Sequence, residues 1–446
     1  MKKLTRFLTA LLLTFALFAH AEMVDTYAFK NQADRTRAIE LAKSLRCPQC
    51  QNQNLVESNS PIAYDLRIEV YKMVDEGKTN QQIIDTMTAR FGNFVIQYCL
   101  DRMKDGEFPS HFLYGACHLK DNGIGVVWHR SPKKTLSRIA TAISTAWRVL
   151  TCREKYDAVY ATHYKGLELV VLLRALRLFR KPIIVWHHQP IVTSKSRLRE
   201  LGGRLFYRGF DRMIFFSQKL VDDSLKSRKA DPRRMVVGHW GADLDFYDRI
   251  SRSVAEARQA SAHEGGAEAP VFIATGKEQR DQSTLIEAFR NTSHHLILYI
   301  GINADPSIPN PNLDAVRRCH PSANVKVVEI CGLLPYEIAC EVAKASCVVI
   351  CCKETRYTAG LTTVVEALAL GLPIICSRNP QIPVDFSRDG CGIFVPYGDV
   401  EGWQRAVDYI ATHPEEARRM GEKGRQIAER TFNDERCARE IAEVIK

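Results

Sequence analysis

Long apolar runs are what this sequence most clearly lacks. After the first twenty residues, no stretch reaches about 18 uncharged apolar residues, so we expect no ordinary transmembrane helix there. The sequence also contains no motif that reads RNA or DNA bases, so we expect no nucleic-acid partner. A net charge of +11 still favours an anionic partner, and nucleotide phosphates and anionic lipid remain.

Cysteine is scarce at the N-terminal end and frequent afterwards. Cys47 and Cys50 precede the other twelve cysteines, which begin at Cys99 and lie mostly inside apolar runs. Buried free thiols are normal in a reducing cytosol and hazardous in an oxidising compartment. The uneven distribution is the first sign that two parts of the chain suit different compartments.

The first 21 residues have the order of a secretory signal peptide. A positive start at Lys2, Lys3 and Arg6 precedes the apolar run Leu8–Phe18 and the small-residue pattern Ala19-His20-Ala21. We therefore expect cleavage after Ala21 and export to the periplasm.

Residues 22–93 are expected to form a small domain of three short helices. Apolar residues at helical spacing cover residues 33–46, and Pro61 after Ser60 favours a second helix to about Asp75. Thr79, with Gln82 three residues later, has the spacing of a capping box that would open the third helix.

Cys47 and Cys50 lie between the first two of these helices. A zinc site would need two further ligands, and residues 22–93 contain no other cysteine and no histidine. A structural disulfide across two residues would close a small loop and stabilise little. A redox dithiol is the favoured interpretation, because Arg46 would favour the thiolate of its neighbour.

Several stretches of this N-terminal segment match a known family: Val24–Thr26, Leu45–Gln53, Ile83-Ile84 and Arg90–Val95. On these residues the segment resembles the CcmH/NrfF family of cytochrome c maturation subunits, which belong to the periplasmic haem lyase complex. The resemblance runs from residue 1 to about 95 and implies that Cys47 and Cys50 act on the CxxCH thiols of an apocytochrome c. It further implies a thiol-redox partner and contact with haem. The family's Pro-Pro element and transmembrane helix do not follow here.

From residue 94 onward, apolar runs typical of buried parallel strands alternate with amphipathic stretches. Two series, separated by a polar segment at about 252–269, predict an α/β fold with two doubly wound, Rossmann-like domains, residues 94–250 and 270–446. Ligands of such sheets bind at the carboxyl ends of the strands, here in a cleft between the domains. The expected strands are Phe94–Tyr98, Ile124–Trp128, Asp157–Ala161, Ile183–Trp186, Met213–Phe216 and Met235–Gly238, then Val271–Thr275, Leu296–Ile300, Val325–Ile330, Cys347–Cys351, Pro373–Cys376 and Gly392–Val395.

The run from Tyr357 to Pro373 predicts a phosphate-binding turn. A strand ends near Cys352, a loop with Gly360 follows, and a helix begins near Thr362. Free N–H groups at that helix start would hold a diphosphate, and the helix dipole favours its charge. The candidate donor-binding residues in this run are Gly360, Leu361, Thr362, Thr363 and Glu366, with Glu366 placed to accept from a ribose diol. An ordinary strand-turn-helix with a surface glutamate is the alternative.

Lys277 and Arg280 follow the first strand of the second series and would flank the same phosphates. Together with Gly241–Tyr247 and the run after Tyr357, they resemble retaining GT-B glycosyltransferases of family 4. That resemblance spans about residues 94–435. It implies a UDP- or GDP-sugar donor in the second domain and an acceptor site in the first. It also implies transfer with retention and no required metal, since cationic groups and a helix N-terminus stabilise the leaving diphosphate.

The chain departs from this second family at two places. An acidic residue usual eight positions before the glutamate is Thr358 here, and the usual glycine-rich first turn is replaced by Met103–Glu107. A family histidine near the sugar matches His187 or His188 after the strand Ile183–Trp186. The sequence barely separates these two, a structural histidine remains an alternative, and His163 is a weaker candidate.

Basic residues interleaved with apolar ones form two clusters in the first domain. A solvated face explains them most simply, and peripheral contact with an anionic membrane, near a lipid-linked acceptor, is the sharper hypothesis. The clusters are Lys133, Lys134, Arg138, Arg148 and Arg153, then Lys195, Arg197, Arg199, Arg204, Arg208 and Arg212.

The sequence therefore predicts a glycosyltransferase joined to a cytochrome c-type biogenesis dithiol domain. The alternative function is that of a periplasmic haem lyase subunit acting through Cys47 and Cys50. Phe94–Tyr98 serves both resemblances, as the end of the first and the first strand of the second. The signal peptide predicts a periplasmic location, whereas a glycosyltransferase of this type is expected in the cytoplasm or at the inner face of the membrane.

Overall fold

The computed structural model describes residues 27, 29, 31–45, 55–56, 61–78, 80, 83, 102–103, 106–128, 138–261, 269–276, 278–302, 310–331 and 335–446. The chain forms two compact units, Met1–Met87 and Thr88–Lys446, which are considered separately below. In these described segments, no helix has the length and apolar character needed to cross a membrane.

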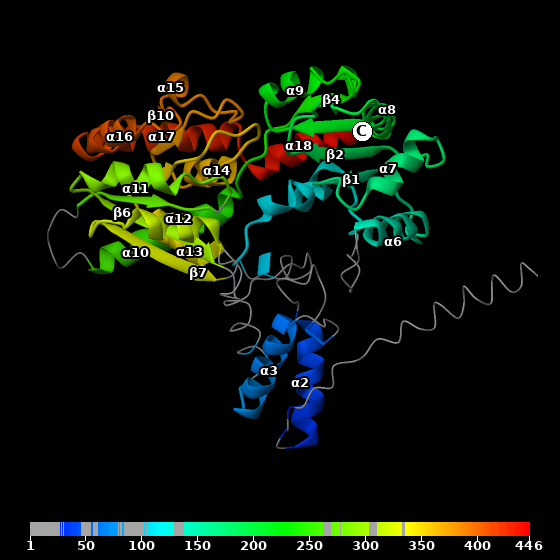
Figure 1. The fold of residues 1–446 in the computed structure, drawn as a ribbon, viewed down its shortest axis with the longest axis horizontal. Helices are drawn as coiled ribbons and strands as arrows, with labels where there is room; N and C mark the ends of the chain where they lie inside the picture. The colour runs from blue at the N-terminus through cyan, green and yellow to red at the C-terminus, as the bar shows by residue number, and fades with distance from the viewer. Residues whose placement is uncertain are drawn as a thin grey trace, which may run out of the picture. The chain divides into compact units, whose positions relative to one another are not determined.

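The first unit contains a pair of helices, α2 (Gln32–Ser44) and α3 (Pro61–Asp75), as the sequence predicted (Figure 1). Asn31 caps α2 by accepting a 2.8 Å hydrogen bond from the Asp34 N–H. The two helices pack through small and aliphatic side chains. The expected third helix, Cys47 and Cys50 lie largely or wholly outside the described residues.

Arg67 fixes the chain that returns toward α3. Its side chain, in a residue only 2% exposed, donates to the carbonyl oxygens of Leu55 at 2.8 Å and Val56 at 3.1 Å. The Leu55 N–H in turn bonds to the Leu45 carbonyl at 3.1 Å. The two flanks of the CxxC segment, Leu45 and Leu55, are thereby held next to each other.

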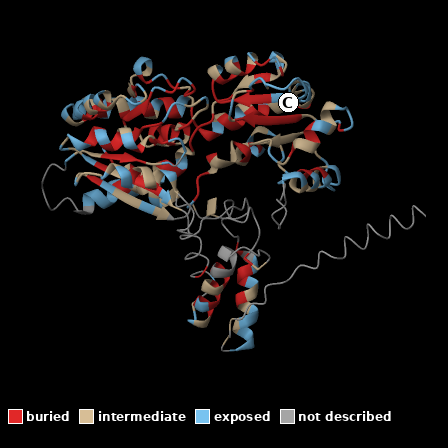
Figure 2. Ribbon diagram, viewed as in Figure 1, coloured by how far each residue is buried: buried red, intermediate tan, exposed pale blue. Residues whose placement is uncertain are grey.

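The second unit has two lobes, each built on a parallel sheet. Lobe 1 has the order β1-β2-β3-β4, and its β2 is buried along its whole length (Figure 2). Short 3-10 turns, η1–η3, precede this sheet. The lobe 1 elements are η1 (Ser110–Leu113), η2 (Ala116–His118), η3 (Lys120–Asn122), α6 (Arg138–Leu150), β1 (Val159–Ala161), α7 (Glu168–Ala175), β2 (Ile183–His187), α8 (Arg197–Tyr207), β3 (Arg212–Phe215), α9 (Gln218–Leu225), η4 (Pro232–Arg234) and β4 (Met235–Val237).

Lobe 2 has the strand order β10-β9-β8-β5-β6-β7. The chain starts in the middle at β5, extends to one side through β6 and β7, and then continues on the other side from β8. The β5/β8 boundary is therefore the topological switch point, where doubly wound sheets bind ligands. The elements are α10 (Leu244–Ser261), β5 (Val271–Ala274), α11 (Gln282–Arg290), β6 (His295–Ile302), α12 (Pro311–Cys319), β7 (Val325–Cys331), α13 (Pro335–Ala343), β8 (Cys347–Ile350), α14 (Leu361–Ala369), β9 (Ile374–Ser377), α15 (Phe386–Asp389), β10 (Gly392–Val395), α16 (Val400–Thr412), α17 (Pro414–Arg430) and α18 (Asp434–Ile445).

The predicted α/β class with two parallel sheets is confirmed, and one expected strand is wrong. Ile124–Trp128 has no strand structure, and Val127 and Trp128 are exposed. A central parallel strand needs burial on both faces, which these residues do not have. Phe94–Tyr98, the other expected strand before β1, lies outside the described residues.

The C-terminal helix α18 returns from lobe 2 to lobe 1 (Figure 1). At the crossing, the Ala242 N–H bonds to the Phe432 carbonyl and the Asp434 N–H to the Ala242 carbonyl, both at 3.0 Å. His118 in lobe 1 lies 3.1 Å from the Asp434 carboxylate, and this hydrogen bond raises the pKa of His118 to about 9. His239 contacts Glu440 of the same helix at 2.9 Å. The two lobes are thus joined by backbone pairing and by charged side chains.

Replacing Gly241 should loosen this crossing. A Cβ atom at Gly241 would lie 1.8 Å from the Phe432 carbonyl carbon, so Gly241→Ala must separate the paired segments. We expect a loss of about 1–3 kcal/mol or more in unfolding free energy, with faster amide exchange in α18.

Gly202→Ala is the matched control, because a Cβ atom at Gly202 in α8 meets nothing within 4 Å. We expect that substitution to stabilise the protein by about 0.4–1 kcal/mol. Calorimetry and hydrogen exchange compare the two variants, and wild-type exchange in α18 of Gly241→Ala would contradict the role of this close approach.

Candidate functional site

The candidate site lies at the switch point of lobe 2, where the loops after β5 and β8 pair with each other. The Asp281 N–H bonds to the Cys351 carbonyl at 3.0 Å, and the Lys353 N–H bonds to the Gln279 carbonyl at 2.8 Å. Because both loops follow the carboxyl ends of adjacent parallel strands, the pairing fixes the wall on which a ligand of such a sheet would rest.

Helix α14 begins beside these paired loops, and no described side chain caps its N-terminus with a hydrogen bond. Its N-cap is Gly360, at φ +92°, and a Cβ atom there would lie 2.8 Å from Cγ2 of Ile350. The Leu361 N–H bonds to the Thr358 carbonyl at 3.1 Å, while the Leu361 side chain is buried in the core. Thr362 is partly exposed next to it. First-turn N–H groups without a cap suit an anion.

Arg280 braces the first turn of α14 from inside the lobe. The residue is only 7% exposed, and its guanidinium donates to the Thr275 carbonyl at 2.9 Å and to Oγ1 of Thr363 at 3.2 Å. It also bonds to the Glu278 carbonyl and approaches Sγ of Cys352 at 3.4 Å.

These contacts change what is expected of the basic pair in the first loop of lobe 2. The sequence predicts that Arg280 contacts the phosphates, and this contact stays a prediction. In the structure, the Arg280 guanidinium already donates hydrogen bonds to acceptors of the protein itself. Its charge lies behind the helix start. Lys277, the other expected phosphate ligand, lies outside the described residues.

Glu366 lies one turn further along α14, at the junction with α10. A quarter of its side-chain surface remains exposed, its carboxylate accepts a hydrogen bond from Tyr247, and burial raises its pKa to about 7. The Tyr247 side chain is itself buried. The Glu366 carboxyl group is therefore partly protonated near neutral pH, in contrast to an ordinary surface glutamate.

His111, from the turn η1, was not found by sequence reasoning. Its Nε2 lies 3.8 Å from Oε1 of Glu366, and its Nδ1 accepts the Asp243 N–H at 3.3 Å. The ring is fully buried beside Trp240, and this burial lowers the pKa of His111 to about 4. The neutral ring that accepts at Nδ1 carries its proton on Nε2, the atom nearest Glu366.

No local pattern could have identified His111. It lies in 3-10 turns without periodicity, and its partners Asp243 and Glu366 are far away in the sequence. The only related signal was Gly241–Tyr247, which contributes both Asp243 and Tyr247 to this cluster.

The structure separates His187 from His188, which follow one another at the end of β2. His187 points into lobe 1 among Tyr164, Phe210 and Phe215, and this burial lowers its pKa to about 3. It is a core residue.

His188 lies on the other side of the strand end. Its Nε2 bonds to the Thr162 carbonyl at 2.8 Å. Burial lowers the pKa of His188, and this hydrogen bond and then the Glu278 carboxylate of lobe 2 partly offset that effect. The third candidate, His163, lies beside it, with ring centroids 5.7 Å apart. His188 is therefore the histidine near the loops of the second lobe.

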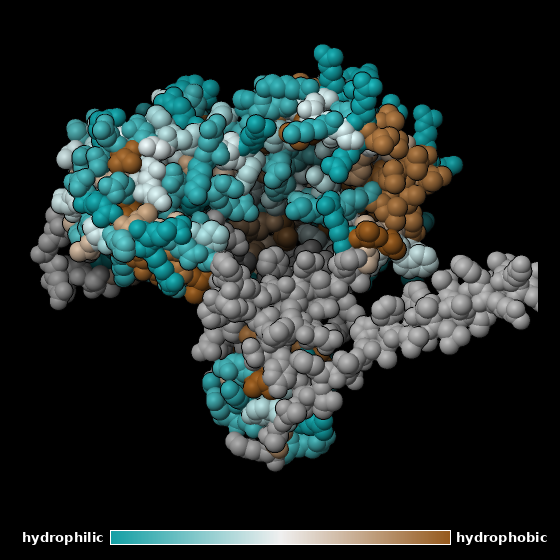
Figure 3. Space-filling model, in the orientation of Figure 1, coloured by the Kyte–Doolittle hydropathy of each residue, from teal (hydrophilic) through white to brown (hydrophobic). Residues whose placement is uncertain are grey.

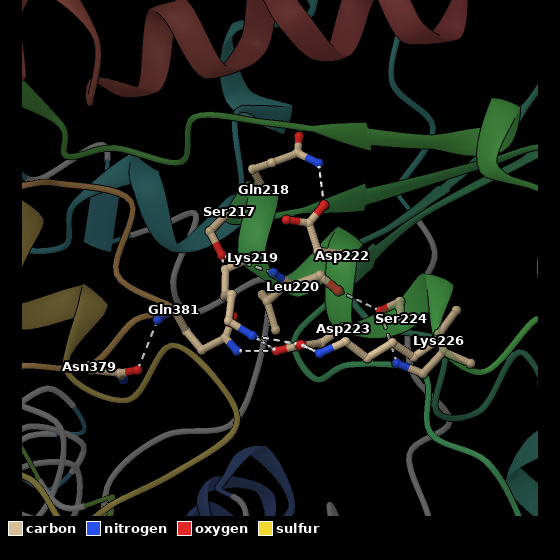
Figure 4. A network of polar contacts seen from close by, with 11 residues as sticks. Ser217, Gln218, Lys219, Leu220, Asp222, Asp223, Ser224, Lys226, Asn379 and Gln381 are labelled. Carbon is tan, nitrogen blue, oxygen red and sulfur yellow. Dashed lines mark hydrogen bonds and ion pairs between the residues drawn. The ribbon is translucent and has the colours of Figure 1, made fainter.

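A polar network connects lobe 1 to the loop that precedes α14 (Figure 4). The Gln381 amide donates to Asp223 of α9 at 2.9 Å, and the Gln381 N–H bonds to Oδ1 of Asn379 at 3.0 Å. The Asn379 amide in turn donates to the carbonyl oxygens of Tyr357 and Ala359 at 3.0 and 3.3 Å. Asn379 thus holds the loop before Gly360, and Gln381, two residues later, contacts lobe 1.

Two family models match the chain. A model described as cytochrome C biogenesis protein, CcmH, covers residues 9–98, and one described as glycosyl transferases group 1 covers residues 254–427.

Two curated proteins illustrate the similarity of the N-terminal segment. The formate-dependent nitrite reductase complex bifunctional subunit NrfFG of Haemophilus influenzae is 81% identical over 94 residues, which are 21% of this chain and 24% of that protein. Subunit NrfF of Escherichia coli K12 is 54% identical over 88 residues, which are 20% of this chain and 69% of that protein. The chain thus spans about a quarter of the first relative.

Among solved structures, similarity covers the larger unit. A glycosyltransferase from Rickettsia africae superposes with a TM-score of 0.54 at 13% identity, over 74% of this chain and 86% of that one. Sucrose-phosphate synthase from Thermosynechococcus elongatus gives 0.54 at 18% identity, over 70% and 80%. Anabaena HepE in complex with UDP gives 0.51 at 16% identity, over 68% and 82%.

At these identities the structural similarity shows the fold alone, and the family models supply the relationship. The chain therefore begins with a segment that belongs to the CcmH/NrfF family of cytochrome c biogenesis proteins, and it continues with a GT-B fold in which residues 254–427 match the glycosyl transferases group 1 model.

Proposed function

We propose that the second unit transfers a sugar from a nucleoside diphosphate sugar to an acceptor. The observation that carries this proposal is the uncapped start of α14 at the switch point, with Glu366 one turn further in. A diphosphate at the first-turn N–H groups would be stabilised by the helix dipole and by the charge of Arg280 behind it. Glu366 would then accept hydrogen bonds from the ribose hydroxyl groups.

The donor is proposed to be a UDP- or GDP-sugar. Structures of HepE, which has a similar fold, contain UDP or UDP-glucose. His188 is proposed to lie beside the sugar, since it follows β2 directly and the Thr162 carbonyl holds its Nε2 at the carboxyl end of the lobe 1 sheet, where ligands of such sheets bind. Retention of anomeric configuration rests on the resemblance to family 4, and the acceptor would bind at lobe 1.

A second function is favoured by the N-terminal family. We propose that Cys47 and Cys50 form a redox dithiol that acts on the CxxCH thiols of an apocytochrome c, near haem. Arg67 supports this by fixing the chain that follows the CxxC segment. Export to the periplasm is part of this second proposal.

Glu366→Ala should weaken binding of UDP or GDP by about tenfold to a hundredfold, because hydrogen bonds to an ionised group are worth about 1.5–3 kcal/mol together. Isothermal titration calorimetry of the full chain measures the affinity. Glu422→Ala, at an exposed position on α17, is the matched control and should bind as the wild type does.

The same pair of measurements has a pH signature. Because Glu366 has a pKa of about 7 before binding and hydroxyl donors favour its ionised form, binding should release a proton near neutral pH. Affinity should then rise with pH through about 7 in the wild type. Glu366→Gln should lose this rise in affinity with pH, because glutamine does not titrate. Any pH dependence from the ligand itself is the same for both proteins and cancels in the comparison. Identical pH profiles would exclude Glu366 as the ribose ligand.

The two adjacent histidines should differ in effect. His188→Ala should slow the release of nucleoside diphosphate from a panel of UDP- and GDP-sugars by about a hundredfold. His187→Phe should retain the rate and the melting temperature, because the His187 Nε2 has no hydrogen-bond partner among the described residues and aromatic rings surround it. A loss of activity in His187→Phe with normal His188→Ala would reverse the assignment.

Cys50→Ser should trap a covalent adduct with an oxidised CxxCH peptide. The Cys47 thiolate attacks one sulfur of the peptide disulfide, forms a mixed disulfide and releases the other peptide thiolate. In the wild type, Cys50 would then attack Cys47, releasing the reduced peptide and leaving a Cys47–Cys50 disulfide.

Intact-mass analysis detects the adduct, in a Cys152→Ser background because Cys152 is exposed. The double variant Cys47→Ser/Cys50→Ser is the control. An equal adduct yield in that control would show that the CxxC cysteines are not the reacting pair.

A further inference from the structure

Large apolar side chains are exposed on the outer helices of lobe 1. On α6, Ile139, Ile143, Trp147 and Leu150 recur at spacings of three and four residues and form one stripe, with Ile139 75% and Trp147 68% exposed. The opposite side of α6 is buried on the lobe. An isolated exposed leucine needs no explanation, but a stripe along a helix does.

The stripe continues onto the neighbouring helices, since α6 packs on α7 and α7 on α8. Ten of the thirteen large hydrophobic side chains exposed in the described residues lie between Ile139 and Leu201, so their exposure is concentrated on one face. Figure 3 shows apolar side chains gathered at the edge of the lobe where these helices lie. Besides those on α6, the exposed members are Leu172, Leu176, Leu178, Val192, Leu198 and Leu201.

The stretch of sequence that contains this face also carries much of the positive charge of the chain. Between Arg138 and Arg212 there are 15 lysines and arginines against 5 aspartates and glutamates, a net charge of +10 beside +11 for the whole sequence. Some of these cations are paired, as in Arg138–Glu168 and Arg204–Glu200. Arg177, Arg197 and Arg199 are exposed and form no ion pair with any described residue.

We propose that the α6–α8 face of lobe 1 binds the surface of an anionic lipid bilayer. The apolar stripe would enter the boundary between headgroups and acyl chains, with Trp147 at the depth that indole rings prefer. The surrounding arginines would contact lipid phosphates. This inference does not depend on the proposed sugar transfer.

A bilayer fits the face better than other partners. A second copy of the chain, docked through the same face, would bring the exposed arginines Arg177, Arg197 and Arg199 of both copies to one interface, which disfavours a symmetric dimer. Nucleic acid would use the cations but leave the stripe of isoleucine, leucine and tryptophan in water. An anionic membrane uses both properties at once.

The test compares binding of the full chain to vesicles of phosphatidylcholine alone and with about one third phosphatidylglycerol. We expect binding to the anionic vesicles only, and its loss in high salt. Ile143→Ser/Trp147→Ser should reduce the partition coefficient by about tenfold or more, since two large apolar side chains are removed. Arg197→Gln and Arg199→Gln should each reduce it by about fivefold.

Two controls lie outside the face, on α16. Tyr409→Ser removes an exposed large side chain and Arg405→Gln removes an exposed cation, and both should bind as the wild type does. All substituted positions are exposed, so melting temperatures should be unchanged.

A separate readout reports this face and not the apolar segment Leu8–Phe18. The difference in tryptophan fluorescence between the wild type and Trp147→Phe reports Trp147 alone. Brominated lipid should quench this difference, and Trp147→Phe should still bind the vesicles. Equal binding of the serine variant and the wild type, or equal affinity for neutral vesicles, would overturn the proposal. A dimer in solution that Trp147→Ser dissociates would also overturn it, in favour of self-association.

Discussion

The buried guanidinium of Arg280 is the contact on which the candidate site depends. It joins the loop after β5, the thiol of Cys352 after β8 and the first turn of α14, three segments that the sheet only brings near each other. Gly276 makes this possible: a Cβ atom there would lie 2.1 Å from Nη2 of Arg280, and its φ is +88°. A charged group without water must be fully bonded, so Arg280 leaves little freedom to the loops around it.

Burial shifts the pKa values of two neighbouring groups in opposite directions, and it favours the neutral form of both. It raises the pKa of Glu366 and lowers that of His111, although the two side chains lie 3.8 Å apart. A buried ion pair would require removing two charges from water, and their attraction does not compensate for that here. His111 is therefore neutral and Glu366 only partly ionised before a ligand binds. A ligand that brings hydroxyl donors to Glu366 changes this balance, and the helix start next to it favours a negative group.

Sequence reasoning succeeded where the information is local and failed where it is not. Pro61 as a first-turn residue located α3, and the continuous apolar run Ile183–Trp186 located β2, because both signals lie within one element. The same continuous run could not show which of His187 and His188 faces the core. Apolar and polar residues alternate along a strand only when one face of the strand is exposed to water. Ile124–Trp128 has an apolar run but no neighbouring strand, and only the tertiary structure decides that.

The cysteines bear on how one chain could combine these two families. Ten cysteines of the second unit are free in the described residues, and six of them are buried. Burial raises the pKa of Cys117 to about 11 and of Cys391 to about 12, and it raises that of Cys347 further still. Because the thiolate is the reactive form, the thiols with raised pKa values react poorly with a redox dithiol while the lobes stay folded. The unfolded chain has no such protection, since every thiol then titrates near its ordinary value. An oxidising compartment would therefore threaten this protein during folding, before the sheets close over their cysteines, and much less afterwards.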